Sequence, residues 1–257
     1  MCGRFTQYEP RSHYIDALNP DVELALAIDE VPIDRYNVAP GTRVLLINQR
    51  EDKLYLDPVL WGYQPAWAKE ARRQPMINAR VETVATSRMF KPLFEHGRAL
   101  VMADGWYEWK KSPSDPKIKQ PYFIYHRFHA PLFFAAISRY HPDALETSDD
   151  DGFVIVTAQS NKGLVDIHDR RPLVLGAAEA NQWLNPDIAS STALALLTEG
   201  AVSADEFAWH PVSKSVGNIR NNGAELIKDT FTPGVIRTSL KTSGLRLLEG
   251  QWIRLEA

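Results

Sequence analysis

Leu132-Phe133-Phe134-Ala135-Ala136-Ile137 is a run of six apolar residues that begins directly after Pro131. Short apolar runs that contain aromatic or β-branched residues and are bounded by Pro or Gly are typical of β-strands. Comparable runs recur along the chain, and they predict strands at Val44–Asn48, Leu54–Trp61, Ala99–Ala103, Tyr122–Tyr125 and Gly152–Thr157, with a weaker one at Phe207–Val212. Strands therefore dominate the prediction.

Helical patterns are fewer and shorter. They predict helices at Arg11–Leu18, Arg80–Met89, Ala177–Leu184 and Ser190–Glu199, and one further turn at Asn222–Ile227. Helices and strands do not alternate regularly, and no GxGxxG motif follows a strand, which argues against a Rossmann-type fold. We expect an α+β fold whose core is an antiparallel, β-rich, barrel-like sheet with short flanking helices.

The composition is that of a globular protein with a substantial core. Of the 257 residues, 44% are hydrophobic and 24% are charged. A single cysteine excludes a disulfide framework and a cysteine-rich zinc site, which favours a reducing, cytoplasmic setting. The first 25 residues contain no signal-peptide h-region, and no apolar run approaches ~18 residues, so we expect neither secretion nor membrane spanning.

Charge is unevenly distributed, although the formal net charge is only −3. Residues 67–98 carry seven Lys or Arg against three Glu, whereas residues 141–151 carry five acidic residues and no Lys or Arg. The basic segment can face phosphates, or it can be an ordinary solvated surface. The acidic segment is expected to be a solvated loop.

The lone cysteine, Cys2, directly follows the initiator in Met1-Cys2-Gly3-Arg4-Phe5. Methionine aminopeptidase generally removes Met1 before a small residue, so the mature chain is expected to begin with Cys2. Its α-amine and thiol, with reference pKa values of about 7.7–8.0 and about 8.5, are both partly nucleophilic near neutral pH. They are also spaced to close a five-membered ring on an aldehyde. A start codon that happens to precede a cysteine is the alternative.

Four polar groups in unusual settings are further candidates for chemistry. Asn37 precedes a turn signal, Asn78 lies at the start of the predicted helix, Glu108 is flanked by Trp and Tyr, and His168 lies in a dense polar loop. Aromatic flanks can desolvate a carboxyl group and raise its pKa, which suits a general acid. Each has a structural alternative: turn formation, helix capping, an ion pair with a surface lysine, and a satisfied loop histidine, respectively.

Aromatic and basic residues also interleave at Trp61, Trp67, Arg88, Met89, Phe90 and Lys91. Bases stack on aromatic rings and basic side chains contact phosphates, although core packing is the commoner use of Met and Phe. His126 and His129 are three residues apart but lack a third ligand, so no metal site is expected.

Several motifs together resemble those of the SOS-response-associated peptidase (SRAP) family, the abasic-site-processing proteins. The motifs occur in order from residue 2 to about residue 227: Cys2-Gly3-Arg4-Phe5, Asn37-Val38-Ala39-Pro40, Asn78-Ala79-Arg80 with Glu82, Ser87-Arg88-Met89-Phe90, Asp104-Gly105-Trp106-Tyr107-Glu108-Trp109, His168-Asp169-Arg170-Arg171-Pro172 and Trp209-His210-Pro211-Val212-Ser213. The resemblance assigns residues 1–228 to an SRAP domain. It says nothing about residues 229–257, which are expected to form a C-terminal extension of uncertain order.

The resemblance implies a covalent cross-link between Cys2 and an abasic site in single-stranded DNA, formed without a cofactor or metal. It gives Cys2, Asn37, Glu108 and His168 catalytic roles: nucleophile, orientation of the Cys2 end, proton transfer, and assistance at the sugar. The residues expected to contact DNA are Arg4, Trp67, Asn78, Arg80, Arg88 and Met89. The loop that contains Trp67 departs from the family pattern in length and composition.

The resemblance also implies a setting and leaves alternatives open. The expected partner is single-stranded DNA containing abasic sites, bound by a monomer in the cytoplasm that associates with the nucleoid. The alternatives are a Cys2-dependent peptidase or autopeptidase, because an N-terminal nucleophile can use its own amine as a base, and a module that binds single strands without chemistry.

Overall fold

The computed structural model describes residues 2–140, 151–230, 245–248 and 251–254. The larger of its sheets has the strand order β11-β10-β9-β6-β3-β4, with β12 paired to β9 and β5 paired to β10. Its strands are β3 (Arg43–Arg50), β4 (Lys53–Leu60), β5 (Asn78–Arg80), β6 (Arg98–Ala103), β9 (Leu132–Arg139), β10 (Gly152–Gln159), β11 (Arg170–Pro172) and β12 (Val174–Leu175). Only the β5–β10 pair among these is parallel.

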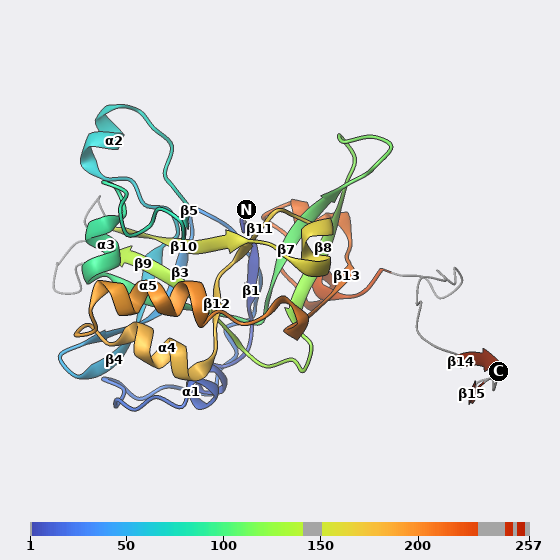
Figure 1. The fold of residues 1–257 in the computed structure, drawn as a ribbon, viewed down its shortest axis with the longest axis horizontal. Coiled ribbons are helices and arrows are strands. Elements are labelled where there is room, and N and C mark those ends of the chain that lie inside the picture. Colours follow the sequence, from blue (N-terminus) through green and yellow to red (C-terminus); the bar gives the residue numbers. More distant parts are fainter. Residues whose placement is uncertain (1, 141–150, 231–244, 249–250, 255–257) are drawn as a thin grey trace.

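The second sheet has the strand order β13-β8-β7-β1-β2, and all of its pairs are antiparallel. Its strands are β1 (Phe5–Gln7), β2 (Arg35–Val38), β7 (Gly105–Lys111), β8 (Lys119–His126) and β13 (Phe207–Pro211). β1 lies between β7 and the edge strand β2, and Figure 1 shows it between β7 and the strands of the larger sheet.

The run at residues 132–137 is buried on both faces of the larger sheet. Successive side chains of a strand point to opposite faces. Accordingly, Phe133, Ala135 and Ile137 pack in one core, while Leu132, Phe134 and Ala136 pack in another. β6 divides its residues between the same two cores. A strand covered on both sides reads as a continuous apolar run, which is why this stretch is so conspicuous in the sequence.

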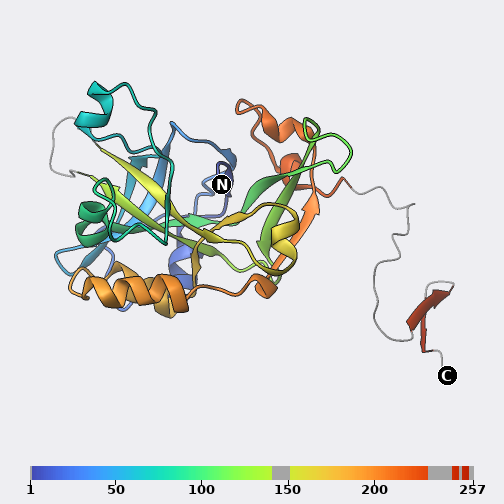
Figure 2. The ribbon, with the colours of Figure 1, turned by 45° about the horizontal axis from the view of Figure 1, so that its top comes forward.

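Helices cover the first core and the smaller sheet covers the second. The helices are α1 (Arg11–Leu18), α2 (Ala66–Glu70), α3 (Lys91–His96), α4 (Ala177–Leu184) and α5 (Ser190–Glu199), and all but α2 contribute buried side chains to the first core. Phe5, Trp106 and Ile124 of the smaller sheet line the second. Figure 2 shows α4 and α5 in orange beneath the long strands, so the order is helices, larger sheet, smaller sheet.

Short 3-10 helices complete the body: η1 (Lys162–Asp166), η2 (Ala204–Glu206), η3 (Lys214–Gly217) and η4 (Ala224–Ile227). η3 and η4 supply Val216 and Leu226 to a third small core against Tyr107 and Phe123. In the predicted extension, β14 (Leu245–Leu248) pairs with β15 (Gln251–Arg254); its other residues beyond Thr230, like most of the predicted acidic loop, lie outside the described ranges. No helix in the described part of the chain is long and apolar enough to cross a membrane.

The predicted fold class, a β-rich α+β fold, is confirmed, as are the predicted strands and the helices at residues 11–18, 177–184 and 190–199. The two sheets are open, each ending in free edge strands within the described residues, so the barrel-like arrangement takes the form of two packed sheets. The predicted final turn is the 3-10 helix η4.

The predicted helix at Arg80–Met89 is wrong. Asn78–Arg80 forms β5, residues 81–86 form turns, and the helix of this region, α3, begins only at Lys91. The reason is long-range pairing: β5 lies in register with Ile155–Thr157 of β10, and the Val81 N–H donates to the Thr157 carbonyl at 2.9 Å. These ladder bonds override a local helical pattern. No helix therefore begins near Asn78, so helix capping, the structural alternative for this residue, is wrong as well.

Candidate functional site around Cys2

Cys2 is fully buried at the start of the chain, in the core between the two sheets. Burial raises the pKa of its thiol, and the Glu108 carboxylate raises it further, while a hydrogen bond from the Arg4 backbone acts in the opposite direction. The thiol is therefore held in its protonated form near neutral pH. It is present as a neutral S–H group rather than as a standing thiolate.

Glu108 faces the same core as Cys2. β7 pairs antiparallel with β1, with Phe5 opposite Trp106, and the Tyr107 N–H donates to the Arg4 carbonyl at 2.9 Å. Because side chains alternate along β7, Glu108 points to the same face as Trp106, toward the Cys2 side. Glu108 is only 3% exposed, and burial raises its pKa to about 7. At neutral pH this carboxyl group is divided between its acid and base forms, as proton transfer requires.

Asn78 connects β5 to the start of the chain. Its Nδ2 donates to the backbone carbonyl of Cys2 at 2.9 Å. The side chain is buried, and its Oδ1 has no hydrogen-bond partner among the described residues. This amide fixes the main chain of Cys2 and leaves an acceptor oxygen beside it.

Asn37 interacts with Arg4, the second residue after Cys2. Its Oδ1 accepts from Arg4 Nη1 at 2.8 Å, and its Nδ2 faces the carbonyls of Val216, Asn218 and Asn221 at 3.3, 3.1 and 2.9 Å. Arg4 Nη1 also donates to the Val216 carbonyl at 2.7 Å. Asn37 therefore anchors the segment around η3 to Arg4, and it acts on the Cys2 end through Arg4.

His168 follows η1 in a loop beside Glu108. Both side chains line one small pocket, together with Trp106, Ile124, Ser160, Leu164, Ile167, Arg170 and Arg171. His168 Nδ1 accepts from the Arg170 N–H at 3.0 Å and lies 2.8 Å from Asp169 Oδ1. Burial lowers the pKa of His168, which favours the neutral ring that accepts from Arg170; a protonated ring would donate to Asp169 instead.

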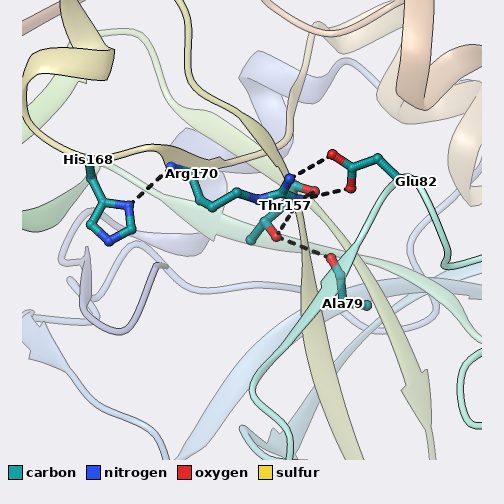
Figure 3. Close-up of polar contacts among 5 residues, drawn as sticks. All are labelled: Ala79, Glu82, Thr157, His168 and Arg170. Atoms are coloured by element: carbon teal, nitrogen blue, oxygen red, sulfur yellow. Dashed lines mark hydrogen bonds and ion pairs between the residues drawn. The ribbon is translucent and has the colours of Figure 1, made fainter.

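Arg170 organises this loop, and residue patterns alone gave it no role. Figure 3 shows its guanidinium between Glu82 and Thr157. Nη1 and Nη2 lie 2.6 and 3.1 Å from the two Glu82 oxygens, and Nη2 also contacts the Thr157 carbonyl at 2.6 Å. Thr157 Oγ1 donates in turn to the Ala79 carbonyl at 3.3 Å. The only signal in the sequence was the position of Arg170 and Glu82 within two of the family motifs.

The remaining predicted DNA-contacting residues lie elsewhere. Arg80 is exposed on β5, two residues from Asn78. Trp67, Arg88 and Met89 line a separate pocket of about 530 Å³, between α2, α3 and the ends of β3 and β9. Trp67 is 38% exposed, with the Arg73 guanidinium 5.3 Å from its ring centroid. Met89 also packs against the first core, so it has the core-packing role that is common for methionine.

The structure thus brings Cys2, Arg4, Asn37, Asn78, Glu108 and His168 together from separate parts of the chain. Glu108, Asn78 and the Arg4 backbone act directly on Cys2. No group of three His, Cys, Asp or Glu side chains in the described ranges is placed to hold a metal ion. The arrangement joins a buried sulfur nucleophile, a carboxyl group of near-neutral pKa and a neutral imidazole. It is suited to nucleophilic chemistry with proton transfer.

Comparison with known proteins identifies the family. The model of a family described as SOS response associated peptidase (SRAP) matches residues 1–219, and the chain belongs to this family. It is 52% identical over 229 residues to the abasic site processing protein YedK of Escherichia coli strain K12, covering 89% of this chain and 99% of that protein. It is 33% identical over 233 residues to the abasic site processing protein YoaM of Bacillus subtilis strain 168, covering 88% and 97%.

A solved structure shows the same fold. The crystal structure of a phage-related protein from Bordetella bronchiseptica superimposes with a TM-score of 0.70 at 38% sequence identity, covering 83% of this chain and 95% of that one. The two-sheet architecture is therefore shared with a structurally characterised protein.

Proposed function

We propose that this protein processes abasic sites in single-stranded DNA by forming a covalent thiazolidine cross-link through Cys2 after removal of Met1. Membership of the SRAP family and similarity to proteins named for abasic site processing support this reaction class. The observation that carries the proposal is the burial of Cys2 beside Glu108, with its carbonyl held by Asn78. The cross-link would shield the lesion from strand cleavage during the response to DNA damage.

The reaction balances without a co-reactant. The Cys2 amine adds to the aldehyde of the ring-opened abasic sugar, and loss of one water gives an imine. The thiol then adds across the C=N bond: a C–S bond forms, and the thiol proton ends on the nitrogen. The product is a thiazolidine, and the imine can no longer act as the electron sink for β-elimination. Because ring closure is intramolecular, a high effective molarity of the thiol is expected.

Glu108 is suited to the proton transfers of this sequence. In its acid form it protonates the hydroxyl group that leaves as water, and in its base form it accepts the proton released by the thiol. A protonated resting thiol favours this order, in which the amine attacks first and the sulfur follows. His168, in the pocket shared with Glu108, assists proton movement at the sugar and reversal of the link.

The neighbouring polar groups orient the reactants. Asn78 holds the Cys2 main chain and offers Oδ1 beside it, and Arg80 on the same β-strand is exposed, where it can contact a phosphate of the DNA strand. Arg4 and Asn37 brace the Cys2 end. Trp67, Arg88 and Met89 provide a second contact region, where an aromatic ring and an exposed cation can engage bases and phosphates.

The direct test is cross-linking of a single-stranded oligonucleotide that carries one abasic site. The wild-type protein should give a heat-stable shifted band, Cys2→Ala none, and Cys2→Ser at most a labile imine. A strand with a tetrahydrofuran analogue, which has no aldehyde, is the matched control and should bind without cross-linking. Intact mass should show Met1 absent and then a gain equal to the abasic strand less one water.

The alternatives give different results in the same assay. A wild-type protein that binds the abasic strand yet never cross-links would falsify the proposal. A peptidase would release a Cys2-dependent cleavage product from a protein substrate or from its own N-terminus. A binding module without chemistry would bind intact and abasic strands equally, with no effect of Cys2→Ala or Glu108→Gln. Blocking Met1 removal should abolish the cross-link in the proposed reaction.

A further inference from the structure

The Glu82–Arg170 pair joins two parts of the site that approach Cys2 from different elements. Arg170 opens β11 and is almost fully buried, whereas the Glu82 side chain is 44% exposed in the turn after β5. Both Glu82 oxygens meet the guanidinium, at 2.6 and 3.1 Å, in a two-pronged arrangement. Such pairs fix orientation as well as charge.

On one side, the guanidinium contacts β10, the strand that pairs with β5 and so with Asn78. Nη2 contacts the Thr157 carbonyl at 2.6 Å and Thr157 Oγ1 at 3.2 Å. The same carbonyl accepts from the Val81 N–H at 2.9 Å, and Oγ1 donates to the Ala79 carbonyl. Arg170 thus locks the register of β5 against β10, which sets the position of the Asn78 amide on Cys2.

On the other side, the backbone of the same residue holds His168. The Arg170 N–H donates to His168 Nδ1 at 3.0 Å, and Figure 3 shows this bond at the opposite end of Arg170 from Glu82. A ring that accepts at Nδ1 carries its proton on Nε2. The placement of Arg170 therefore sets both the orientation of the ring and its tautomer.

We infer that Glu82 is a positioning residue, whose carboxylate fixes Arg170 and thereby holds Asn78 and His168 in the geometry needed for reaction at Cys2. Without it, the buried guanidinium loses its only carboxylate partner among the described residues and turns to other acceptors. Its movement loosens the His168 bond and the β5 register together. This inference rests on the proposed cross-linking function, and it concerns a residue whose side-chain hydrogen bonds in the described part of the chain go to Arg170 and not to Cys2.

Glu82→Gln, Glu82→Ala and Glu82→Asp test it, with Glu206→Gln as the matched control. The Glu206 side chain is 42% exposed and pairs with His126 at 3.9 Å, outside the hydrogen bonds that join Glu82, Arg170 and Thr157. Two readouts are compared: the single-turnover cross-linking rate at saturating abasic strand, and the ¹⁵N signals of the His168 ring, assigned with Glu206→Gln and His168→Gln spectra.

We expect Glu82→Ala to lower the saturated rate about 10- to 100-fold, the scale of a small misplacement of reacting groups, with little change in half-saturating strand concentration. Glu82→Gln should also lower the saturated rate. Glu82→Asp keeps the carboxylate, so its rate should lie between those of Glu82→Ala and the wild type. The His168 signals should move from an unprotonated Nδ1 toward a mixture of tautomers. Glu206→Gln should shift only His126 and leave the rate unchanged.

Folded variants that keep the wild-type rate and His168 signals would overturn the inference, as would a loss that appears only in strand binding. If Glu82→Ala does not fold, Glu82→Gln and Glu82→Asp decide the question. If the wild-type protein does not cross-link at all, the proposed function fails. The His168 spectra of the Glu82 variants still decide whether the carboxylate positions the ring.

Discussion

Glu108 shows how one residue acquires its chemistry from its position on a strand. Its neighbours Trp106 and Tyr107 are fully buried, and alternation along β7 turns Glu108 toward the core that contains Cys2. A carboxyl group there is desolvated, which raises its pKa to about 7. The aromatic residues that flank Glu108 in the sequence predict this raised pKa, because aromatic neighbours exclude water from a carboxyl group.

A pH profile of cross-linking tests the role of Glu108. Its acid form is lost as pH rises through about 7, while the free Cys2 amine is gained as pH rises through about 8. The wild-type rate should therefore follow a bell-shaped curve with its maximum between these values. Glu108→Gln should lower the rate about 100-fold or more and leave only the ascending limb. An unchanged profile in Glu108→Gln would assign the proton transfers to another group.

At the scale of elements, sequence patterns located most of the longer strands and missed β7 and the short strands that depend on their partners. Residues 132–137 and 99–103 are apolar because two cores cover them. β5 and β11 have three residues each and exist through their pairing with β10. Local patterning does not encode such pairing, so the segment after Arg80 was mistaken for a helix.

Local sequence patterns also do not show the long-range contacts within the site. Family motifs indicated Asn37, Asn78, Glu108 and His168, but not what they contact. Asn37 meets carbonyls of residues 216–221, about 180 positions away, and Arg170 meets Glu82. These contacts depend on the packing of whole elements, and no spacing within the chain records them.

Gly105, where β7 begins, tests the packing between strands. A Cβ at this position would lie 2.5 Å from Phe123 Cζ and 2.6 Å from the Ile124 carbonyl oxygen of β8. A backbone atom cannot move aside cheaply, so Gly105→Ala should destabilise the protein by about 1–3 kcal/mol. Gly217→Ala is the control, because a Cβ there meets nothing within 4 Å. Chemical denaturation measures both, and equal stability of the two variants would contradict this account of β7.

At the scale of the molecule, Asp104 ties the layers together where β6 turns into β7. Its Oδ2 accepts from the Tyr8 N–H at 2.7 Å, just after β1, and from the Tyr14 hydroxyl of α1 at 2.8 Å. One carboxyl group thus joins the smaller sheet, the larger sheet and the helical layer. Burial outweighs these hydrogen bonds and raises the pKa of Asp104 to about 7.

This raised pKa makes the stability of the whole fold depend on pH in a defined direction. The unfolded carboxyl group has a pKa of about 3.9, so between about pH 4 and 7 the folded protein binds more protons than the unfolded chain. The contribution of Asp104 is therefore largest at low pH and declines as pH rises to 7, by at most about 1.4 kcal/mol per pH unit. Glu108, whose pKa is also raised to about 7, acts in the same direction.

Urea denaturation from pH 5 to 8 measures this dependence. The free energy of unfolding should decrease with pH in the wild type and decrease less steeply in Asp104→Asn, whose Oδ1 can still accept from Tyr8 and Tyr14. Asp16→Asn, on the exposed face of α1, controls for the loss of one carboxylate. Parallel curves for Asp104→Asn and the wild type would show that Asp104 stays ionised throughout and that its bonds to Tyr8 and Tyr14 outweigh its burial.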